Sequence, residues 1–333
     1  MIRKPAAIAA LLSCALSAAW AGAFGARDWA KYPPIVDRTR PEALWAIGDI
    51  HGDYERMLRL LLAAHLVETK PGKPERLTWS GGAATLVVTG DMIDKGPKPM
   101  DVLRSLLALQ ASARRQGGEV IVLAGNHEAE LLEPEGRPSK DRAADWARLG
   151  VTPASLQACE GQVGQFLCSL PFGARLGDWF FSHAGNTAGR TIAQLSSGIR
   201  AGAYSLTGPD SLLEARLGEG KQWIAPPDSK FGGERQLLES YAAALGVKHM
   251  VQGHQHQAVK FDDGAERGKG EMFQRWGLLF LIDVGMSREI GDSQGAALRI
   301  TASGASAVCP DGGETPLWDA ASTDALGRAI CTR

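Results

Sequence analysis

Five short apolar runs in this chain each end in a polar signature that contains glycine. Short apolar runs bounded by glycine are typical of buried strands, and layered α/β folds bind ligands where such strands end. We therefore expect the five signatures to converge in space. In chain order they are Gly48-Asp49-Ile50-His51-Gly52-Asp53, Gly90-Asp91-Met92-Ile93-Asp94-Lys95, Gly125-Asn126-His127-Glu128, Ser182-His183-Ala184-Gly185 and Gly253-His254-Gln255-His256.

The hydrophobic spacing of three segments predicts amphipathic helices. They are Tyr54–His65, with Asp53 as N-cap, Met100–Arg114, stopped by Gly117 and Gly118, and Gln236–Leu245, ended by Gly246. Strands, polar loops and helices in alternation predict a layered α/β fold. Two further apolar runs, Leu278–Ile282 and Ala296–Ile300, predict strands of a second sheet.

The N-terminus has the pattern of an export signal. Arg3 and Lys4 precede an apolar stretch, residues 6–19, and Ala19-Trp20-Ala21 fits a small-residue cleavage site. We expect a cleaved signal peptide over residues 1–21 and a periplasmic or secreted protein. An N-terminal core helix is the alternative, and a lipobox-like stretch before Cys14 leaves lipidation of that cysteine open.

The length and composition of the remaining chain favour one large domain over residues 22–333. The sequence has 333 residues, 44% of them hydrophobic, and shows neither an internal repeat nor a low-complexity linker. Residues 130–170 break the strand pattern and are polar. We interpret them as a helical insertion that forms a lid or a wall of the substrate site.

Four cysteines remain once the signal segment is removed, and an even number in an exported protein predicts disulfides. They are Cys159, Cys168, Cys309 and Cys331. Three pairings are possible, of which we favour the two bridges that are local in sequence. No CxxC pair is present, which argues against a zinc site built from thiolates.

Histidine placement is the strongest evidence for a functional site. Five of the seven histidines lie in the polar signatures, which scattered core histidines would not do. His65, in a predicted helix, and His249, in a predicted strand, are interpreted as structural.

The signatures together supply the ligands of a two-metal site, in which one carboxylate bridges two ions. Asp49 and His51 lie two residues apart on an extended segment, so they share a face and would bind the first ion; a plain polar turn is the alternative. Asp91 is the expected bridge. The second ion would be bound by Asn126, His183 and His254, and His256 would reach the first ion or a phosphate. Mixed Asp, Asn and His ligands suit manganese, iron or zinc.

The ordered motifs GDIHGDY, GDMIDKGP, GNHE, HAG and GHQH resemble the calcineurin-like metallophosphoesterase superfamily. Within it, the chain is most similar to the phosphoprotein phosphatase branch, and particularly to the bacterial Shewanella-like phosphatases. The resemblance covers Leu44 to Ser287. It implies a central β-sandwich flanked by helices, with two divalent ions at the carboxyl ends of the strands and the same ligand positions.

The resemblance also implies catalytic roles. His127 matches the general acid that protonates the leaving oxygen, and Asp94 matches the carboxylate that orients His127. The nucleophile would be a hydroxide that bridges the two metals and attacks phosphorus in line. Because neighbouring residues at a strand end point in opposite directions, His127 and Asn126 should not reach the same ion.

The chain departs from the phosphatase branch at three positions. Lys95 replaces an arginine that binds phosphate, which keeps the charge but loses the bidentate fork. His256 is a second histidine, more common in phosphodiesterases. Arg216 stands where a phosphate-binding arginine is expected, without the usual aromatic flanks; a surface arginine is the alternative.

These observations predict a metal-dependent phosphatase acting on phosphomonoesters, either phosphoproteins or small phosphate esters. A phosphodiesterase or nucleotide pyrophosphatase is the first alternative, and a non-catalytic metal-binding module is the second. The net charge of −1 gives no electrostatic footprint for nucleic acid. Beyond the signal segment, no apolar stretch is long enough to span a bilayer.

Overall fold

The computed structural model describes residues 27–69, 77–132, 140–202, 208, 210–218, 232–322 and 326–332. The predicted signal peptide, residues 1–21, lies outside the described residues. Among the described helices, none is at once long and apolar enough to cross a membrane.

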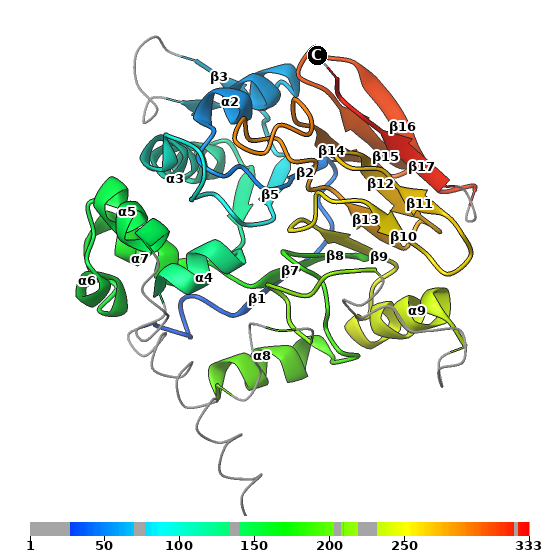
Figure 1. Ribbon diagram of the computed structural model, residues 1–333, viewed down its shortest axis with the longest axis horizontal. Helices are drawn as coiled ribbons and strands as arrows, with labels where there is room; N and C mark the ends of the chain where they lie inside the picture. The colour runs from blue at the N-terminus through cyan, green and yellow to red at the C-terminus, as the bar shows by residue number, and fades with distance from the viewer. Residues whose placement is uncertain are drawn as a thin grey trace, which may run out of the picture.

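Two large sheets form the centre of the molecule (Figure 1). The first has the strand order β1 (Ile35–Arg38), β7 (Gly173–Leu176), β8 (Trp179–Ser182), β9 (His249–Gln252), β13 (Leu279–Leu281), β12 (Met272–Arg275) and β17 (Leu326–Ala329). The second has the order β16 (Glu314–Asp319), β15 (Gly304–Val308), β14 (Ala297–Ile300), β2 (Leu44–Ile47), β5 (Thr85–Val88) and β6 (Glu119–Val122). Two short ladders pair β3 (Val67–Glu68) with β4 (Thr78–Trp79) and β10 (Val259–Lys260) with β11 (Glu266–Arg267).

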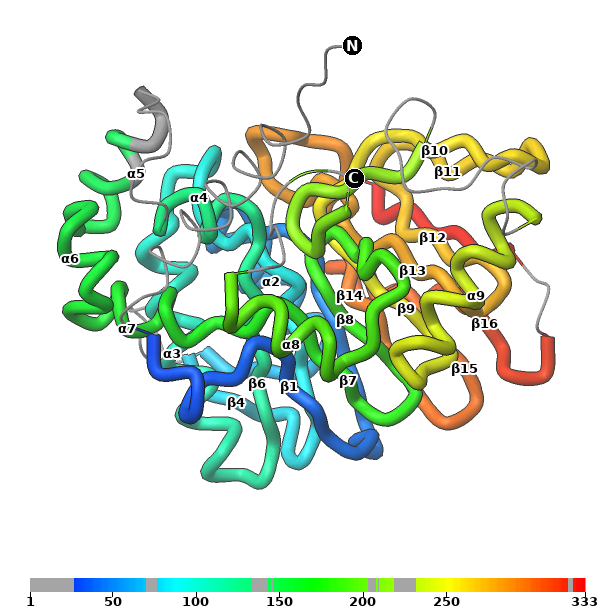
Figure 2. The backbone as a smooth tube through the Cα atoms, turned by 90° about the horizontal axis from the view of Figure 1, so that it is seen from below, coloured from blue at the N-terminus to red at the C-terminus, as the bar shows by residue number. Residues whose placement is uncertain are grey.

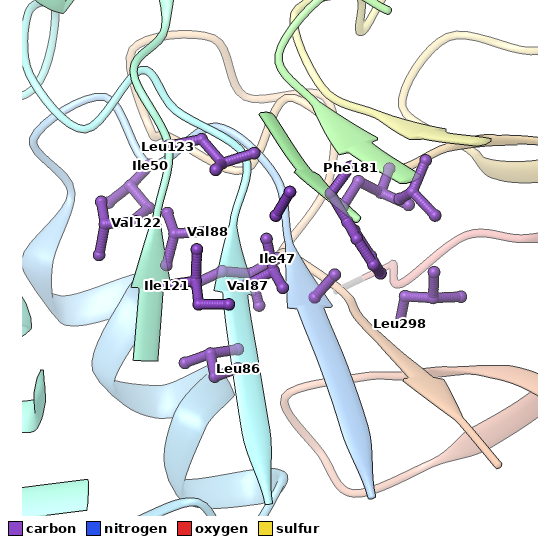
Figure 3. Close-up of a cluster of buried hydrophobic side chains, with 14 of the residues drawn as sticks. Ile47, Ile50, Leu86, Val87, Val88, Ile121, Val122, Leu123, Phe181 and Leu298 are labelled. Atoms are coloured by element: carbon purple, nitrogen blue, oxygen red, sulfur yellow. The ribbon is translucent and has the colours of Figure 1, made fainter. Parts of the chain in front are cut away.

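The strands that precede the polar signatures run parallel within each sheet. β2, β5 and β6 are parallel neighbours in one sheet, and β8, β9 and β13 are parallel neighbours in the other. Their carboxyl ends therefore meet, and the loops that follow lie together. Apolar side chains fill the space around these strands, with Ile47, Val87 and Val88 fully buried beside Phe181 and Leu298 (Figure 3). The predicted α/β fold with two sheets is confirmed.

Helices lie on both sides of the sheets: α2 (Tyr54–Ala63) and α3 (Pro99–Arg115) on one side, α8 (Ile192–Arg200) and α9 (Glu234–Leu245) on the other (Figures 1 and 2). The Asp53 side chain caps α2 by accepting a hydrogen bond from the Arg56 backbone N–H. Gly246 ends α9 in the left-handed conformation. Both cap predictions are confirmed.

The described part of the segment predicted as a helical insertion is mostly helical. They are α4 (Asn126–Leu132), α5 (Lys140–Leu149), α6 (Pro153–Gln157) and α7 (Gly161–Ser169), grouped at one edge of the molecule (Figure 1). The Cys159–Cys168 disulfide joins the end of the α6 turn to α7, and Cys309–Cys331 joins the end of β15 to the chain beyond β17. Both pairs match the predicted local bridges. The role of the segment as a lid stays a prediction.

Candidate metal centre

The candidate ligands lie in loops at the carboxyl ends of β2, β5, β6, β8 and β9, where both sheets contribute. Several of these loops hold a non-glycine residue at positive φ, the conformation that L-residues rarely adopt: His51, Asp91, Asp94, Lys95 and His254. The loops also pack closely, since a Cβ on Gly253 would collide with Oδ1 of Asp49. Strained backbone at so many chemically active residues is typical of a functional site.

Asp91 is the carboxylate shared by two groups of possible metal ligands. The first group is His51, Asp91 and His127, and the second is Asp91, His183 and His254. Oδ2 of Asp91 lies 3.7 Å from Nε2 of His51 and 3.4 Å from Nε2 of His183. This is the arrangement expected of a bridging carboxylate.

Asp49 lies beside both groups and completes the buried cluster. Its Oδ2 is 3.9 Å from Nε2 of His51, and its Oδ1 is 4.0 Å from Nδ1 of His183. Oδ1 also accepts a hydrogen bond from the His254 backbone N–H at 3.0 Å. The first and last predicted ligand loops are therefore joined directly.

Two of the histidines are oriented for metal binding by backbone carbonyls. Nδ1 of His183 lies 2.9 Å from the Thr89 carbonyl oxygen, and Nδ1 of His51 lies 3.2 Å from that of Ile93. Such a carbonyl fixes the proton on Nδ1 and leaves the Nε2 lone pair for a cation. In both residues, Nε2 is the nitrogen that faces Asp91.

Burial and mutual contacts shift the pKa values of the groups in the cluster. Burial, followed by repulsion from Asp283, raises the pKa of Asp49 well above its usual value. Burial lowers the pKa of His51 to about 4 and that of His254 well below its usual value. Despite its burial, His183 has a pKa raised to about 10 by Asp91 and Asp49. A divalent metal would take the place of the His183 proton and stabilise the buried carboxylates, and mixed oxygen and nitrogen donors suit manganese, iron or zinc. The residues present fit two divalent ions.

Asn126 and His127 point to different parts of the cluster, although not for the reason that the sequence suggested. They do not end a strand: Asn126 begins α4. The Asn126 Nδ2 group donates to Glu130, which leaves Oδ1 3.1 Å from Nε2 of His183. Nε2 of His127 lies 3.7 Å from Oδ2 of Asp91, and its Nδ1 lies 3.1 Å from Oδ2 of Asp94. The His127–Asp94 pair thus stands at the edge of the first group.

Lys95 and Arg216, the two residues predicted to bind phosphate, lie beside different groups of possible metal ligands. Nζ of Lys95 lies 3.2 Å from Nε2 of His51. Nε of Arg216 lies 3.2 Å from Nε2 of His254. Each side chain therefore contacts a candidate metal ligand, and the predicted role of both in binding phosphate stays a prediction.

His256 belongs to neither group of possible ligands in the described chain. Its Nδ1 pairs with Asp292, and its Nε2 lies 2.8 Å from the side-chain nitrogen of Gln257. The Asp292 carboxylate and the Gln257 amide thus contact both of its nitrogens, and the predicted role of His256 at the first ion or a phosphate stays a prediction. His249 and His65, interpreted as structural, also lie outside both groups.

A profile of calcineurin-like phosphoesterases matches residues 43–258, a range that holds every candidate ligand from Asp49 to His256. The chain belongs to the calcineurin-like phosphoesterase family. The resemblance inferred from the five motifs is thereby confirmed, and the protein is a member of a family of phosphoester hydrolases.

Three relatives are similar to this calcineurin-like phosphoesterase over different lengths. An uncharacterized protein of Schizosaccharomyces pombe is 29% identical over 81% of this chain and 78% of its own. Shewanella-like protein phosphatase 2 of Arabidopsis thaliana is 33% identical over 37% of this chain and 31% of its own. A symmetrical bis(5′-nucleosyl)-tetraphosphatase of Escherichia coli is 35% identical over 31% and 30%, respectively. The chain thus aligns with less than a third of each of these two named enzymes.

The fold of this calcineurin-like phosphoesterase is similar to that of solved structures. A cold-active protein tyrosine phosphatase of a psychrophilic Shewanella species has a TM-score of 0.62 and 19% sequence identity. The match covers 86% of this chain and 82% of that one. At this identity, the likeness concerns the fold alone.

Two buried carboxylates of this calcineurin-like phosphoesterase were not predicted as site residues. Glu128 accepts hydrogen bonds from the backbone N–H groups of residues 91, 92, 93 and 125, so it braces the Asp91 loop. Asp283 follows β13, is 1% exposed, and has no hydrogen-bond partner at Oδ2. The sequence signal for Asp283 was available, because it follows an apolar run as Asp49 does.

Proposed function

We propose that the protein is an exported, metal-dependent phosphatase that hydrolyses phosphomonoesters, either phosphoproteins or small phosphate esters. The observation that carries this proposal is the His127–Asp94 pair beside Asp91, the carboxylate shared by both ligand groups. A monoester leaves as an alkoxide or phenoxide that needs a proton, and this pair stands where one can be delivered.

The ions would be held by Asp49, His51 and Asp91 on one side and by Asp91, Asn126, His183 and His254 on the other. When bound, two divalent ions supply Lewis acidity toward the phosphoryl oxygens and toward an attacking water.

The chain's own groups complete the reaction. Lys95 and Arg216 bind the phosphoryl oxygens and keep the ester oriented for in-line displacement. Asp94 holds the proton on Nδ1 of His127, so the proton on Nε2 faces the leaving oxygen. After transfer, His127 recovers a proton from solvent, since its side chain is 23% exposed.

A diesterase or nucleotide pyrophosphatase is the second candidate, and the similarity to the Escherichia coli tetraphosphatase supports it. The arrangement of His256 does not, because this histidine is paired with Asp292 and Gln257 away from both ligand groups. We therefore rank monoesters first.

Export is supported by the N-terminal sequence pattern and by the two disulfides, since disulfides persist mainly in oxidising compartments. We further propose a single domain over residues 22–333, in which residues 130–170 form a wall of the substrate site.

The test is turnover by protein stripped with a chelator and reloaded with manganese, iron or zinc. Substrates are an aryl phosphate monoester, its diester analogue, phosphopeptides and a dinucleoside tetraphosphate. We expect the highest kcat/KM for a monoester. Preference for the diester or the tetraphosphate would contradict the monoester proposal, and no turnover with any of these metals would favour the non-catalytic alternative.

A further inference from the structure

The segment that carries Arg216 has neither helix nor long strand to hold it beside the metal cluster. It is nevertheless buried on both sides of the arginine: Ala215 is 1% exposed and Leu217 is 2% exposed, while Arg216 itself is partly exposed. At its other end, the Leu212 carbonyl accepts a hydrogen bond from the Ala184 N–H, next to the ligand His183. On the other side of the arginine, the chain is held through the backbone of Leu217.

Gln255, the residue between the two histidines of the last motif, makes those contacts. Its Oε1 accepts a hydrogen bond from the Leu217 backbone N–H at 2.8 Å, and its Nε2 donates to the Leu217 carbonyl at 2.9 Å. The side chain is 5% exposed, so both bonds are shielded from water. A single amide thus satisfies both backbone groups of the residue that follows Arg216.

The backbone that carries Gln255 is held by a buried arginine. The buried guanidinium of Arg267 donates to the carbonyl oxygens of Gln255 and Gln257, and to that of Asp283 at the end of β13. The next residue toward the N-terminus, His254, is held at positive φ with its N–H on Asp49. Gln255 therefore links this restrained loop to the segment that carries Arg216.

The guanidinium of Arg216 has a defined position beside the metal cluster. Arg216 Nε lies 3.2 Å from Nε2 of His254, and Nη1 donates to Oε1 of Gln257 at 3.3 Å. Arginine binds phosphate best when its planar fork is already oriented.

We propose that Gln255 is the positioning residue for phosphate binding: its amide sets Arg216 against the metal cluster, while Gln255 itself touches neither substrate nor metal. This inference rests on the proposed function, since it assigns Arg216 to the phosphoryl group of the substrate.

The test uses the metal-loaded full chain with Gln255→Met, which keeps the length of the side chain and removes both hydrogen bonds. Orthophosphate is the probe, measured as a Kd by calorimetry and as a competitive inhibition constant. We expect full metal content, a Kd for orthophosphate raised about tenfold (about 1.4 kcal/mol), and a matching rise in KM with a smaller change in kcat.

A double-mutant cycle with Arg216→Ala separates positioning from general destabilisation. Because Gln255 acts through Arg216, Gln255→Met should add nothing to the Kd of the Arg216→Ala variant. Independent, additive effects would overturn the proposal, as would an unchanged Kd in Gln255→Met or a loss of bound metal.

Gln274 offers a matched control. Its side chain also donates to a backbone carbonyl, that of Leu317, and accepts from a backbone N–H, that of Gly277, within the β12 region. Gln274→Met should lower thermal stability without changing orthophosphate binding; a rise in Kd equal to that of Gln255→Met would overturn the proposal.

A second variant serves if Gln255→Met does not fold. Gln255→Glu retains an acceptor for the Leu217 N–H and is expected to raise the Kd for orthophosphate by less than tenfold. An unchanged Kd would overturn the proposal.

The experiment distinguishes failure of the proposed function from failure of the Gln255 inference. A wild-type protein that binds orthophosphate but turns over no ester would refute the proposed function and leave the Gln255 inference standing. A wild-type protein that turns over esters with no role for Arg216 in phosphate binding would refute the inference alone.

Discussion

Oδ2 of Asp91 lies 3.4 Å from Nε2 of His183, although the two residues follow strands of different sheets. The carboxylate thereby connects the two halves of the sandwich at their common edge. Burial would raise the pKa of Asp91, but His183 and His127 hold it well below its usual value, so it remains an anion that can bind two cations.

Replacing Asp91 with asparagine should remove more metal than replacing a terminal ligand. Since one carboxylate contributes to both groups, we expect Asp91→Asn to lose both equivalents, whereas His254→Ala should lose mainly one. Elemental analysis of the purified variants measures this. Retention of two full equivalents by Asp91→Asn would exclude a bridging role.

Asp283 should affect the metal-free and metal-loaded protein in opposite directions. Its buried Oδ2 has no hydrogen-bond partner, and it repels Asp49. Asp283→Asn removes a negative charge, so we expect a higher unfolding temperature without metal and an affinity for metal about 10 to 100 times lower, the usual effect of losing a supporting group. Thermal unfolding with and without manganese tests both. A variant that is destabilised to the same extent in both states would show that Asp283 is only structural.

Stability should fall as the pH rises from 4.5 to about 7 because of the pKa of one carboxyl group, that of Glu234. Burial, followed by a hydrogen bond with Asp262, raises the pKa of Glu234 to about 7, and Arg275 opposes this only in part. The folded state therefore holds a proton that the unfolded chain releases near pH 4.5. This contribution is complete below pH 4.5 and is lost as the pH rises through about 7.

Glu234→Gln stays neutral at every pH, so the difference between its unfolding temperature and that of the wild type should change between pH 5 and 8. The wild type should lose stability relative to the variant as the pH increases. Parallel curves for the two proteins would contradict the assignment.

The proposed export predicts two properties of the mature protein. Mass spectrometry of secreted or periplasmic material should find an N-terminus near Gly22 and no free thiol, because Cys159–Cys168 and Cys309–Cys331 are paired. An intact Met1 together with four alkylatable thiols, one at each of these positions, would reject export and disulfide formation alike.

Most of the site could be predicted because its residues follow apolar strands directly. The runs that begin at Leu44, Thr85 and His249 give both the strand and the ligand loop. Asp283 follows the same rule, but a single aspartate without a neighbouring histidine did not stand out. The contact of His256 with Asp292 was not predicted, because the two residues are 36 positions apart in the sequence.

Other contacts in the structure could not be predicted from any local sequence pattern. The pairing of Gln255 with Leu217 joins residues 38 positions apart, and Leu217 belongs to no periodic pattern. The ladders β3–β4 and β10–β11 are only two residues long, too short for alternation to be recognised. Such contacts depend on the tertiary arrangement, which one sequence does not encode locally.

The central claim is that His127, oriented by Asp94, protonates the leaving group. His127→Asn should keep both metals and lose about 10²- to 10⁴-fold in turnover of alkyl phosphates, the usual contribution of a positioned acid. Asp94→Asn should show the same trend more weakly, since Asp94 acts only through the imidazole. His65→Asn is a matched control: His65 is exposed at positive φ, which asparagine tolerates, and this variant should retain full turnover.

The most direct measurement is kcat/KM of His127→Asn and wild type across a series of aryl and alkyl phosphates, with metal content determined on the same samples. We predict a deficit that shrinks as the leaving group becomes more acidic and nearly vanishes for a nitrophenolate, which leaves without a proton. A deficit that is constant across the series, or one that accompanies loss of metal, would contradict the account.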